Sequence, residues 1–141
     1  MDAIDQQLLA LLRENARAPT AELARRLGLS RTTVQSRIER LERGGVILGY
    51  GVRTGAAHSA AQVRALVMIA AAPRLSQAIE GALRRLPQVR TLHSVSGVHD
   101  FIASVEAAGM AELDALVDRI GTLDGVERTS TAILMTTRID R

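Results

Sequence analysis

Apolar side chains recur at helical spacing through the first part of the chain. Asp2 stands before the first apolar stripe as an N-cap, with Asp5 in the reciprocal N3 position. Three stripes follow one another, formed by Ile4, Leu8, Leu11 and Leu12, then by Leu23 and Leu27, and then by Val34, Ile38 and Leu41. The pattern predicts three helices that share one small core.

A very short turn joins the second and third predicted helices. Thr20, directly after Pro19, is the expected N-cap of the second helix. Gly28 ends that helix, because glycine adopts the left-handed conformation at little cost, and Ser30 caps the third helix. So short a connection makes the two helices cross steeply, as in a helix-turn-helix.

The third predicted helix carries a polar face opposite its apolar stripe. One helix fits the major groove of DNA, and Arg, Gln, Thr and Ser can bond to base edges or phosphates there. The residues expected to contact double-stranded DNA are Arg31, Thr32, Thr33, Gln35, Ser36, Arg37, Arg40 and Arg43. An ordinary solvated face is the alternative, but the ordered series of caps and turn favours DNA binding.

The chain changes character after the third helix. Gly44 and Gly45 stop the helix, and residues 46–50 are a β-prone run that predicts a wing or an exit strand. Residues 51–62 are rich in Gly, Ala, Ser and Thr. We therefore expect a DNA-binding domain over 1–50, a linker over 51–62, and a second domain over 63–141.

The second domain contains an internal repeat with an offset of 37 residues. Each half predicts a strand, an amphipathic helix and a further strand. The matched positions are Leu86-Pro87-Gln88-Val89 with Leu123-Asp124-Gly125-Val126, Met68 with Val105, Ile79 with Leu116, and Leu83 with Ile120. Two such units predict a ferredoxin-like βαββαβ sandwich, so the fold class is α+β, with an N-terminal winged, three-helix helix-turn-helix domain.

One face of the predicted sheet is left uncovered by helices. Apolar residues alternate on both faces of the last strand, where Leu134 and Ile133 are neighbours. We expect a second subunit to cover this face, which would place two recognition helices about one helical turn apart on DNA. The alternative is that the alternation only reflects an Ala-rich background.

Composition narrows the function classes. The net charge of +3 comes from 18 cations, all of them arginine, against 15 acids. Because Cys is absent, disulfides and thiolate chemistry are excluded. The longest apolar run, residues 65–72, is too short for a membrane span, so we expect a cytoplasmic protein with no membrane partner.

A series of residues in a fixed order covers nearly the whole length of the chain: Asp2, Asp5, Leu23-Ala24, Gly28-Leu29-Ser30, Thr33-Val34, Arg37-Ile38, Arg40-Leu41-Glu42, Gly45-Val46-Ile47, Gly49-Tyr50 and Gly97-Val98-His99-Asp100. With these residues the chain resembles the Lrp/AsnC family of feast/famine regulators. The resemblance implies dimers that assemble into octamers, and transcription control by a small molecule, commonly an amino acid. The linker lacks the family's leucine-glycine pair, and Arg31 stands where relatives often carry proline.

The turn at Gly97 is the candidate effector site. Its backbone N–H groups could receive a carboxylate, and Asp100 could bind an ammonium group. The resemblance places the pocket between dimers and adds Val98 and His99 from the turn, with Thr129 and Thr131 as wall residues. Alternatively, Gly97 makes a tight hairpin that Asp100 caps.

No catalytic apparatus, cofactor motif or metal-ligand spacing is visible in the sequence, so we expect no catalytic residues, no cofactor and no metal. Two alternative functions remain. Siroheme decarboxylases resemble the same architecture, but an enzyme does not need the outward face of Arg31, Gln35, Ser36 and Arg40. A DNA-organising protein without any effector is the other alternative.

Overall fold

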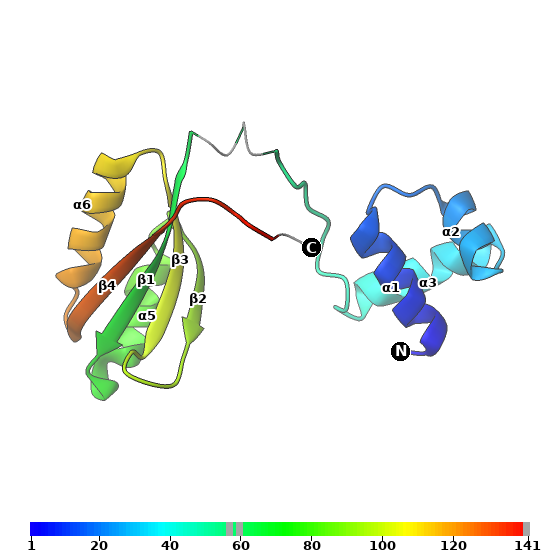
Figure 1. Ribbon diagram of the computed structural model, residues 1–141. Coiled ribbons are helices and arrows are strands. Elements are labelled where there is room, and N and C mark those ends of the chain that lie inside the picture. Colours follow the sequence, from blue (N-terminus) through cyan, green and yellow to red (C-terminus); the bar gives the residue numbers. More distant parts are fainter. Residues whose placement is uncertain (56–57, 59–60, 140–141) are drawn as a thin grey trace. The chain divides into compact units, whose positions relative to one another are not determined.

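The computed structural model describes residues 1–55, 58 and 61–139. The chain divides into two compact units, Met1–Arg53 and Thr54–Arg141, and each unit is described by itself (Figure 1). Residues 56, 57, 59 and 60 of the predicted linker, and residues 140 and 141 of the predicted second domain, lie outside the described residues.

The first unit is a three-helix bundle, as predicted. Its helices are α1 (Ala3–Glu14), α2 (Thr20–Leu27) and α3 (Arg31–Arg43). They share a core of Leu8, Leu12, Leu23, Ala24, Val34 and Leu41. The apolar stripes of the sequence therefore meet in one small core, which positions α3 against the other two helices.

Hydrogen bonds at the helix ends explain where the helices begin and end. The Asp5 amide donates to Asp2 Oδ1 at 2.8 Å, and the Asp2 amide donates to Asp5 Oδ2 at 3.0 Å, so the predicted capping box is present. Gly28 has a φ of 67°, and Ser30 Oγ accepts from the Thr33 amide at 3.1 Å. These contacts confirm the short turn between α2 and α3.

Thr20 is not an N-cap, which corrects the prediction for the start of α2. Pro19 takes the cap position, and its carbonyl accepts from the amides of Glu22 and Leu23. With Thr20 as the N-cap, the first helical residue would be Ala21. Pro19 is the N-cap instead, so α2 begins one residue earlier, at Thr20.

Residues 46–50 form no strand, so the prediction of a wing or exit strand is wrong for this segment. The amides of Val46 and Ile47 both donate to the Leu41 carbonyl, which turns the chain back over the end of α3. Leu48 is 93% exposed. A β-prone run needs a partner strand, and the described part of the first unit offers none.

The second unit is the predicted ferredoxin-like sandwich. Four strands, β1 (Val63–Ala71), β2 (Val89–Ser94), β3 (Phe101–Ala107) and β4 (Val126–Leu134), form an antiparallel sheet in the order β2-β3-β1-β4. The short helix η1 (Pro73–Leu75) leads into α5 (Ser76–Arg84), and α6 (Met110–Gly121) follows β3. Both long helices cover the same face of the sheet (Figure 1).

The internal repeat is visible in the hydrogen bonds after each helix. Val89 donates to the Leu86 carbonyl and Val126 to the Leu123 carbonyl, both at 3.0 Å. The repeat is less regular in the strands, because the buried positions of β1 lie 36 residues before those of β3.

The predicted match of Met68 with Val105 as equivalent positions of the repeat is therefore wrong. Val105 faces the helices, whereas Met68 lies on the opposite face of the sheet, where its strand neighbour is Ile102. The buried Ala71 lies 8 residues before Ile79, whereas the buried Ala107 lies 9 residues before Leu116, so the offset is 36 in the strands and 37 in the helices. A shift by one residue reverses the face of a strand.

Candidate functional site

The outward face of α3 is a polar, exposed surface at the edge of the first unit. Arg31, Thr32, Gln35, Ser36 and Arg43 are all exposed on it. A shallow hollow of about 430 Å³ lies over this face, lined by Thr20, Arg31, Thr32, Gln35, Ser36 and Glu39. Thr20 comes from the start of α2, so the hollow is formed jointly by the two helices of the helix-turn-helix.

Glu39 is part of this surface, although the sequence did not select it as a site residue. Gln35 Nε2 donates to Glu39 Oε1 at 3.1 Å, across one turn of α3. Arg43 Nε donates to the backbone carbonyl of Glu39 at 3.4 Å. Gln35 and Glu39 are four residues apart, and side chains at this spacing are neighbours on a helix, so the sequence alone could have indicated the pair.

Two arginines of α3 are held by carboxylates of α1. Arg37 Nη1 lies 2.7 Å from Asp2 Oδ2 and 2.8 Å from Asp5 Oδ1. Arg40 Nη2 donates to both oxygens of Asp5, at 2.9 and 2.8 Å. The Asp5 side chain is only 1% exposed, and the Arg37 side chain is 19% exposed, so this is a partly buried ion-pair cluster.

The same contacts shift the pKa values of the cluster. The hydrogen bond from Arg37 is the main reason that the pKa of Asp2 falls to about 2. The amide of Asp2 is the main cause that lowers the pKa of Asp5, and Arg37 and Arg40 add to it while burial opposes it. Both carboxylates therefore stay ionised at neutral pH, and their hydrogen bonds raise the pKa of Arg37.

The predicted DNA contacts thus fall into two groups on α3. Arg31, Thr32, Gln35, Ser36 and Arg43 lie on the exposed face. Arg37, whose side chain is 19% exposed, and Arg40, whose side chain stays 58% exposed, are both bonded to α1. Thr33 is exposed, and its Oγ1 lies 2.7 Å from Ser30 Oγ at the helix start. Sequence reasoning missed this division, because the arginines are more than thirty residues from Asp2 and Asp5.

The Gly97 turn joins β2 to β3 in the second unit. Gly97 has a φ of 109°, a conformation that favours glycine. Asp100 Oδ2 accepts from the Ala71 amide at 2.8 Å, and the Asp100 amide donates to the Ile69 carbonyl at 2.8 Å. Asp100 therefore ties the turn to β1. This is a structural role, but its side chain bonds to β1 and not to the hairpin that the alternative expected it to cap.

The predicted effector residues are only partly brought together. Val98 is exposed and His99 half-buried on the turn itself. Thr129 and Thr131 lie on β4, and β1 separates them from β3. Arg128 also reaches the turn, where its Nη2 donates to the Val98 carbonyl at 3.4 Å. No sequence pattern indicated this contact, because it joins residues that are thirty positions apart.

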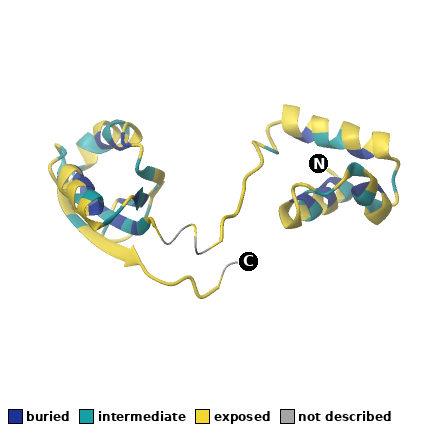
Figure 2. Cartoon of the chain, turned by 90° about the horizontal axis from the view of Figure 1, so that it is seen from above, coloured by how far each residue is buried: buried dark blue, intermediate teal, exposed yellow. Residues whose placement is uncertain are grey.

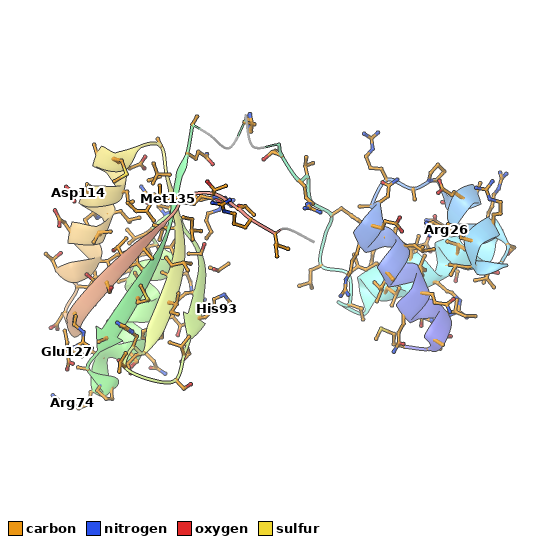
Figure 3. All side chains as sticks on the ribbon, viewed as in Figure 1. Arg26, Arg74, His93, Asp114, Glu127 and Met135 are labelled. Carbon is orange, nitrogen blue, oxygen red and sulfur yellow. The ribbon has the colours of Figure 1, made fainter. Side chains whose placement is uncertain are left out.

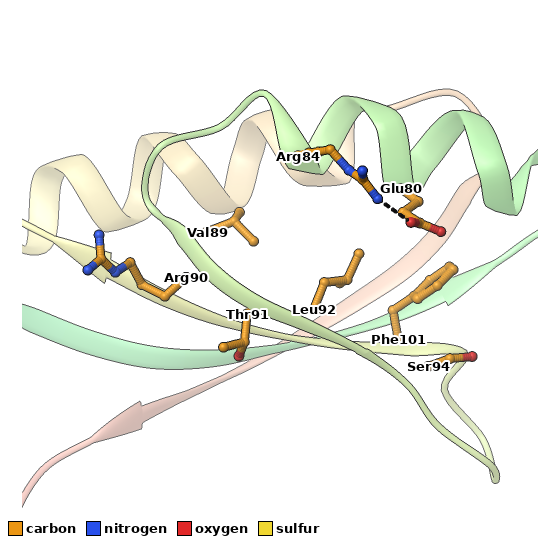
Figure 4. A pocket seen from close by; sticks show the side chains of 8 residues that line it. All are labelled: Glu80, Arg84, Val89, Arg90, Thr91, Leu92, Ser94 and Phe101. Carbon is orange, nitrogen blue, oxygen red and sulfur yellow. Dashed lines mark hydrogen bonds and ion pairs between the residues drawn. The ribbon is translucent and has the colours of Figure 1, made fainter. Parts of the chain in front are cut away.

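A pocket of about 400 Å³ lies beside the turn, between α5 and the edge strand β2 (Figure 4). Ser94 and Phe101, the residues that end β2 and begin β3, form one end of it. Val89 and Leu92 provide apolar walls, and Arg84 pairs with Glu80 at 2.7 Å on the side of α5. The pocket therefore combines apolar surface with two cations, Arg84 and Arg90, and one anion, Glu80.

Metal and membrane features were searched within the described ranges. Over 1–55, 58 and 61–139, no cluster of three or more His, Cys, Asp and Glu side chains could hold a metal ion. Among the helices of these described residues, none has the length and hydrophobicity needed to span a membrane.

The fold and the exposed face of α3 define a helix-turn-helix protein with a ferredoxin-like second domain. The family model of the AsnC-type helix-turn-helix domain matches residues 1–42, and that of the Lrp/AsnC ligand binding domain matches residues 64–141. The chain therefore belongs to the Lrp/AsnC family of transcriptional regulators.

Relatives with known names agree with this assignment. The regulator LrpA of Mycobacterium tuberculosis is 35% identical over 142 residues, which covers 100% of this chain and 95% of LrpA. An uncharacterised helix-turn-helix regulator of Pyrococcus abyssi is 31% identical over 135 residues, covering 95% of this chain and 85% of the relative.

Solved structures show the same fold. The structure of Escherichia coli AsnC has a TM-score of 0.87 at 25% identity, and covers 100% of this chain and 96% of AsnC. A Neisseria meningitidis transcriptional regulator, solved as a complex with L-Met, has a TM-score of 0.88 at 20% identity, and covers 99% of this chain and 93% of that one.

Proposed function

We propose that this regulator binds double-stranded DNA sequence-specifically as a dimer, through the exposed face of α3. The observation that carries the proposal is that face: its arginine, glutamine, threonine and serine side chains are exposed and form a hollow with the start of α2. Arginine can pair with phosphates or guanine, and glutamine with adenine, so the face has groups for both attachment and base reading.

The open face of the sheet supports the proposed dimer. Leu66, Met68 and Ile102 lie on the face opposite the helices and are only half-buried in the single chain. β4 is exposed along most of its length, as the yellow strand of Figure 2 shows. Polar side chains border this patch on β2, among them His93 (Figure 3). A second copy would remove the patch from water and bring two α3 helices to one operator.

A glutamate at position 66 tests the dimer. Leu66→Glu should convert dimer to monomer in sedimentation experiments, because it places a charge in the proposed contact. Met110→Glu is the matched control, since Met110 is 54% exposed at the start of α6, where a glutamate is well tolerated. Unchanged sedimentation of Leu66→Glu would contradict a dimer through this face.

We further propose that a small molecule, an amino acid being the first class to test, binds at the Gly97 turn and changes how dimers pack. The exposed Val98, the half-buried His99 and the adjoining pocket with Arg84 and Glu80 support this site. A zwitterion needs a cation, an anion and apolar surface, and these groups offer all three. Asp100 keeps the turn in place, whereas Thr129 and Thr131 would line the site only in a larger assembly, such as the octamer.

DNA binding is tested by selecting bound fragments from genomic DNA and then measuring one arginine variant. Arg31→Ala should weaken binding and reduce the slope of log K against log salt by about 1, if Arg31 meets a phosphate. Arg119→Ala, an equal charge change on α6, should leave the slope unchanged. Equal slopes for both variants would contradict the assignment of this face.

The effector proposal is tested by thermal shifts against the amino acids. A ligand at 100 times its Kd stabilises the folded state by about 2.7 kcal/mol. His99→Ala should reduce that shift, while Gln77→Ala, an exposed position of α5, should not. No shift with any amino acid would instead favour a DNA-organising protein without an effector, and haem-like absorbance of the purified protein would favour the enzyme alternative.

A further inference from the structure

Glu39 places a negative charge on the surface that is proposed to meet DNA. It is exposed, it lines the hollow of α3, and it lies one turn after Gln35. The carboxylates of Asp2 and Asp5 are paired with guanidinium groups, whereas Glu39 is bonded to a neutral amide. A carboxylate beside phosphates weakens attachment, so its presence on this face calls for a compensating contact.

The bond between the two side chains determines which groups face outward. An ionised carboxylate can only accept hydrogen bonds, so the Gln35 amide must direct its Nε2 toward Glu39 Oε1. Oε1 of Gln35 is then directed away from that bond. Because side chains of a helix lean toward its N-terminus, the Glu39 carboxylate lies over the turn that carries Gln35. Together they offer acceptor oxygens at one place on α3, beside the second N–H of the Gln35 amide, which the bond to Glu39 does not use.

We propose that Gln35 and Glu39 form a pair that selects a base with an exocyclic amino group, with cytosine preferred. In the major groove, N4 of cytosine is a donor that a glutamate can accept from, and N6 of adenine is the only other exocyclic amine. Guanine presents O6 and N7 and thymine presents O4, all acceptors, which the carboxylate repels. Glu39 thus favours one class of base and rejects the others.

This inference rests on the proposed DNA binding through α3, and a selection with randomised half-sites tests it. The full-length protein, Glu39→Gln and Glu14→Gln are compared. Glutamine keeps the length of Glu39 but also donates, so it tolerates guanine. Glu14 is an exposed glutamate of α1 whose change removes the same charge away from this face, and whose contact to Arg26 is 3.4 Å long.

For the unchanged protein we expect one position of each half-site to select cytosine over guanine. Glu39→Gln should reduce that preference by roughly 5- to 150-fold while binding to unrelated DNA becomes tighter. Glu14→Gln should keep the preference. Identical base preferences for Glu39→Gln and the unchanged protein would overturn the inference alone, whereas failure of the unchanged protein to select any DNA would overturn the proposed function.

Discussion

An apolar core holds the helices in both units of this chain, and the first unit adds buried ion pairs to it. In the first unit, the buried Asp5 joins α1 to α3 through Arg37 and Arg40, beside a core of six residues. In the second unit, the buried cluster of fourteen residues is wholly apolar, and strand pairing adds to it. The helix proposed to read DNA is therefore positioned by buried ion pairs in addition to a small apolar core, whereas the proposed dimerisation domain is positioned by hydrophobic packing and strand pairing.

Because of this difference, we expect the stability of the two units to respond to different substitutions and conditions. A buried carboxylate with two guanidinium partners depends on pH and on each partner. A packed apolar core depends on side-chain volume. Tyr50, the single tyrosine of the chain, lies in the first unit and can report on it separately.

Leu83→Ala should have the largest effect, and it should be confined to the second unit. Leu83 is fully buried, and such a truncation in a core costs about 2 to 5 kcal/mol of stability. The amides of residues 63–134 should exchange their hydrogens faster. The unfolding midpoint of the first unit, followed by Tyr50 fluorescence, should stay unchanged. Leu48→Ala, at a position that is 93% exposed, is the control. A parallel loss in the first unit would contradict separate stabilisation.

Asp5→Ala should destabilise the first unit and leave the second unit unchanged. It removes half of the capping box and the shared partner of Arg37 and Arg40, so it should destabilise the first unit more than loss of any exposed ion pair. Tyr50 fluorescence during urea unfolding measures the change. Asp114→Ala, on the exposed side of α6, should have no comparable effect. An unchanged midpoint for Asp5→Ala would refute electrostatic positioning of α3.

Ser30→Ala should have a smaller effect within the same unit. Ser30 Oγ caps α3 by accepting from the Thr33 amide, and loss of such a cap costs about 0.5 to 2 kcal/mol. The same fluorescence experiment should show unfolding of the first unit at a lower urea concentration. Ser76→Ala is the comparison, because the serine at the start of α5 makes no side-chain cap bond. Equal shifts for both serines would argue against the cap.

Acidification should change the stability of the first unit least of the four tests. The direction of the change is a loss of stability as the pH falls. Because the pKa of Asp2 is lowered to about 2, its contribution to stability is present above its ordinary pKa near 4, and is lost as pH falls toward 2. Half of the Asp2 side chain is exposed, so solvent weakens the contribution. Asp2→Asn should make the stability of the first unit, measured by Tyr50 fluorescence during unfolding, depend less on pH between pH 4 and about 2. A curve identical to that of the unchanged protein would exclude the contact with Arg37.

Local patterns explain how much of the structure could be predicted. The capping box of Asp2 and Asp5, the left-handed Gly28 and the Ser30 cap each depend on residues a few positions apart. The repeat predicted the antiparallel sandwich because both halves have the same periodicity. The errors at residues 46–50 and at Met68 arose where a strand needs a partner or where one extra residue reverses a face.

The spacing of residues along the chain was enough to predict the three helices of the first unit, the sandwich of the second unit, the outward polar face of α3 and the family. Those properties follow from spacing, and spacing can be read along the chain. The fold determines which arginines of α3 are paired with α1, since Asp5 engages Arg37 and Arg40 across more than thirty residues, while the Arg40 side chain stays 58% exposed. It also showed that Asp100 holds the Gly97 turn, because a hydrogen bond to Ala71 depends on the fold that brings the two together.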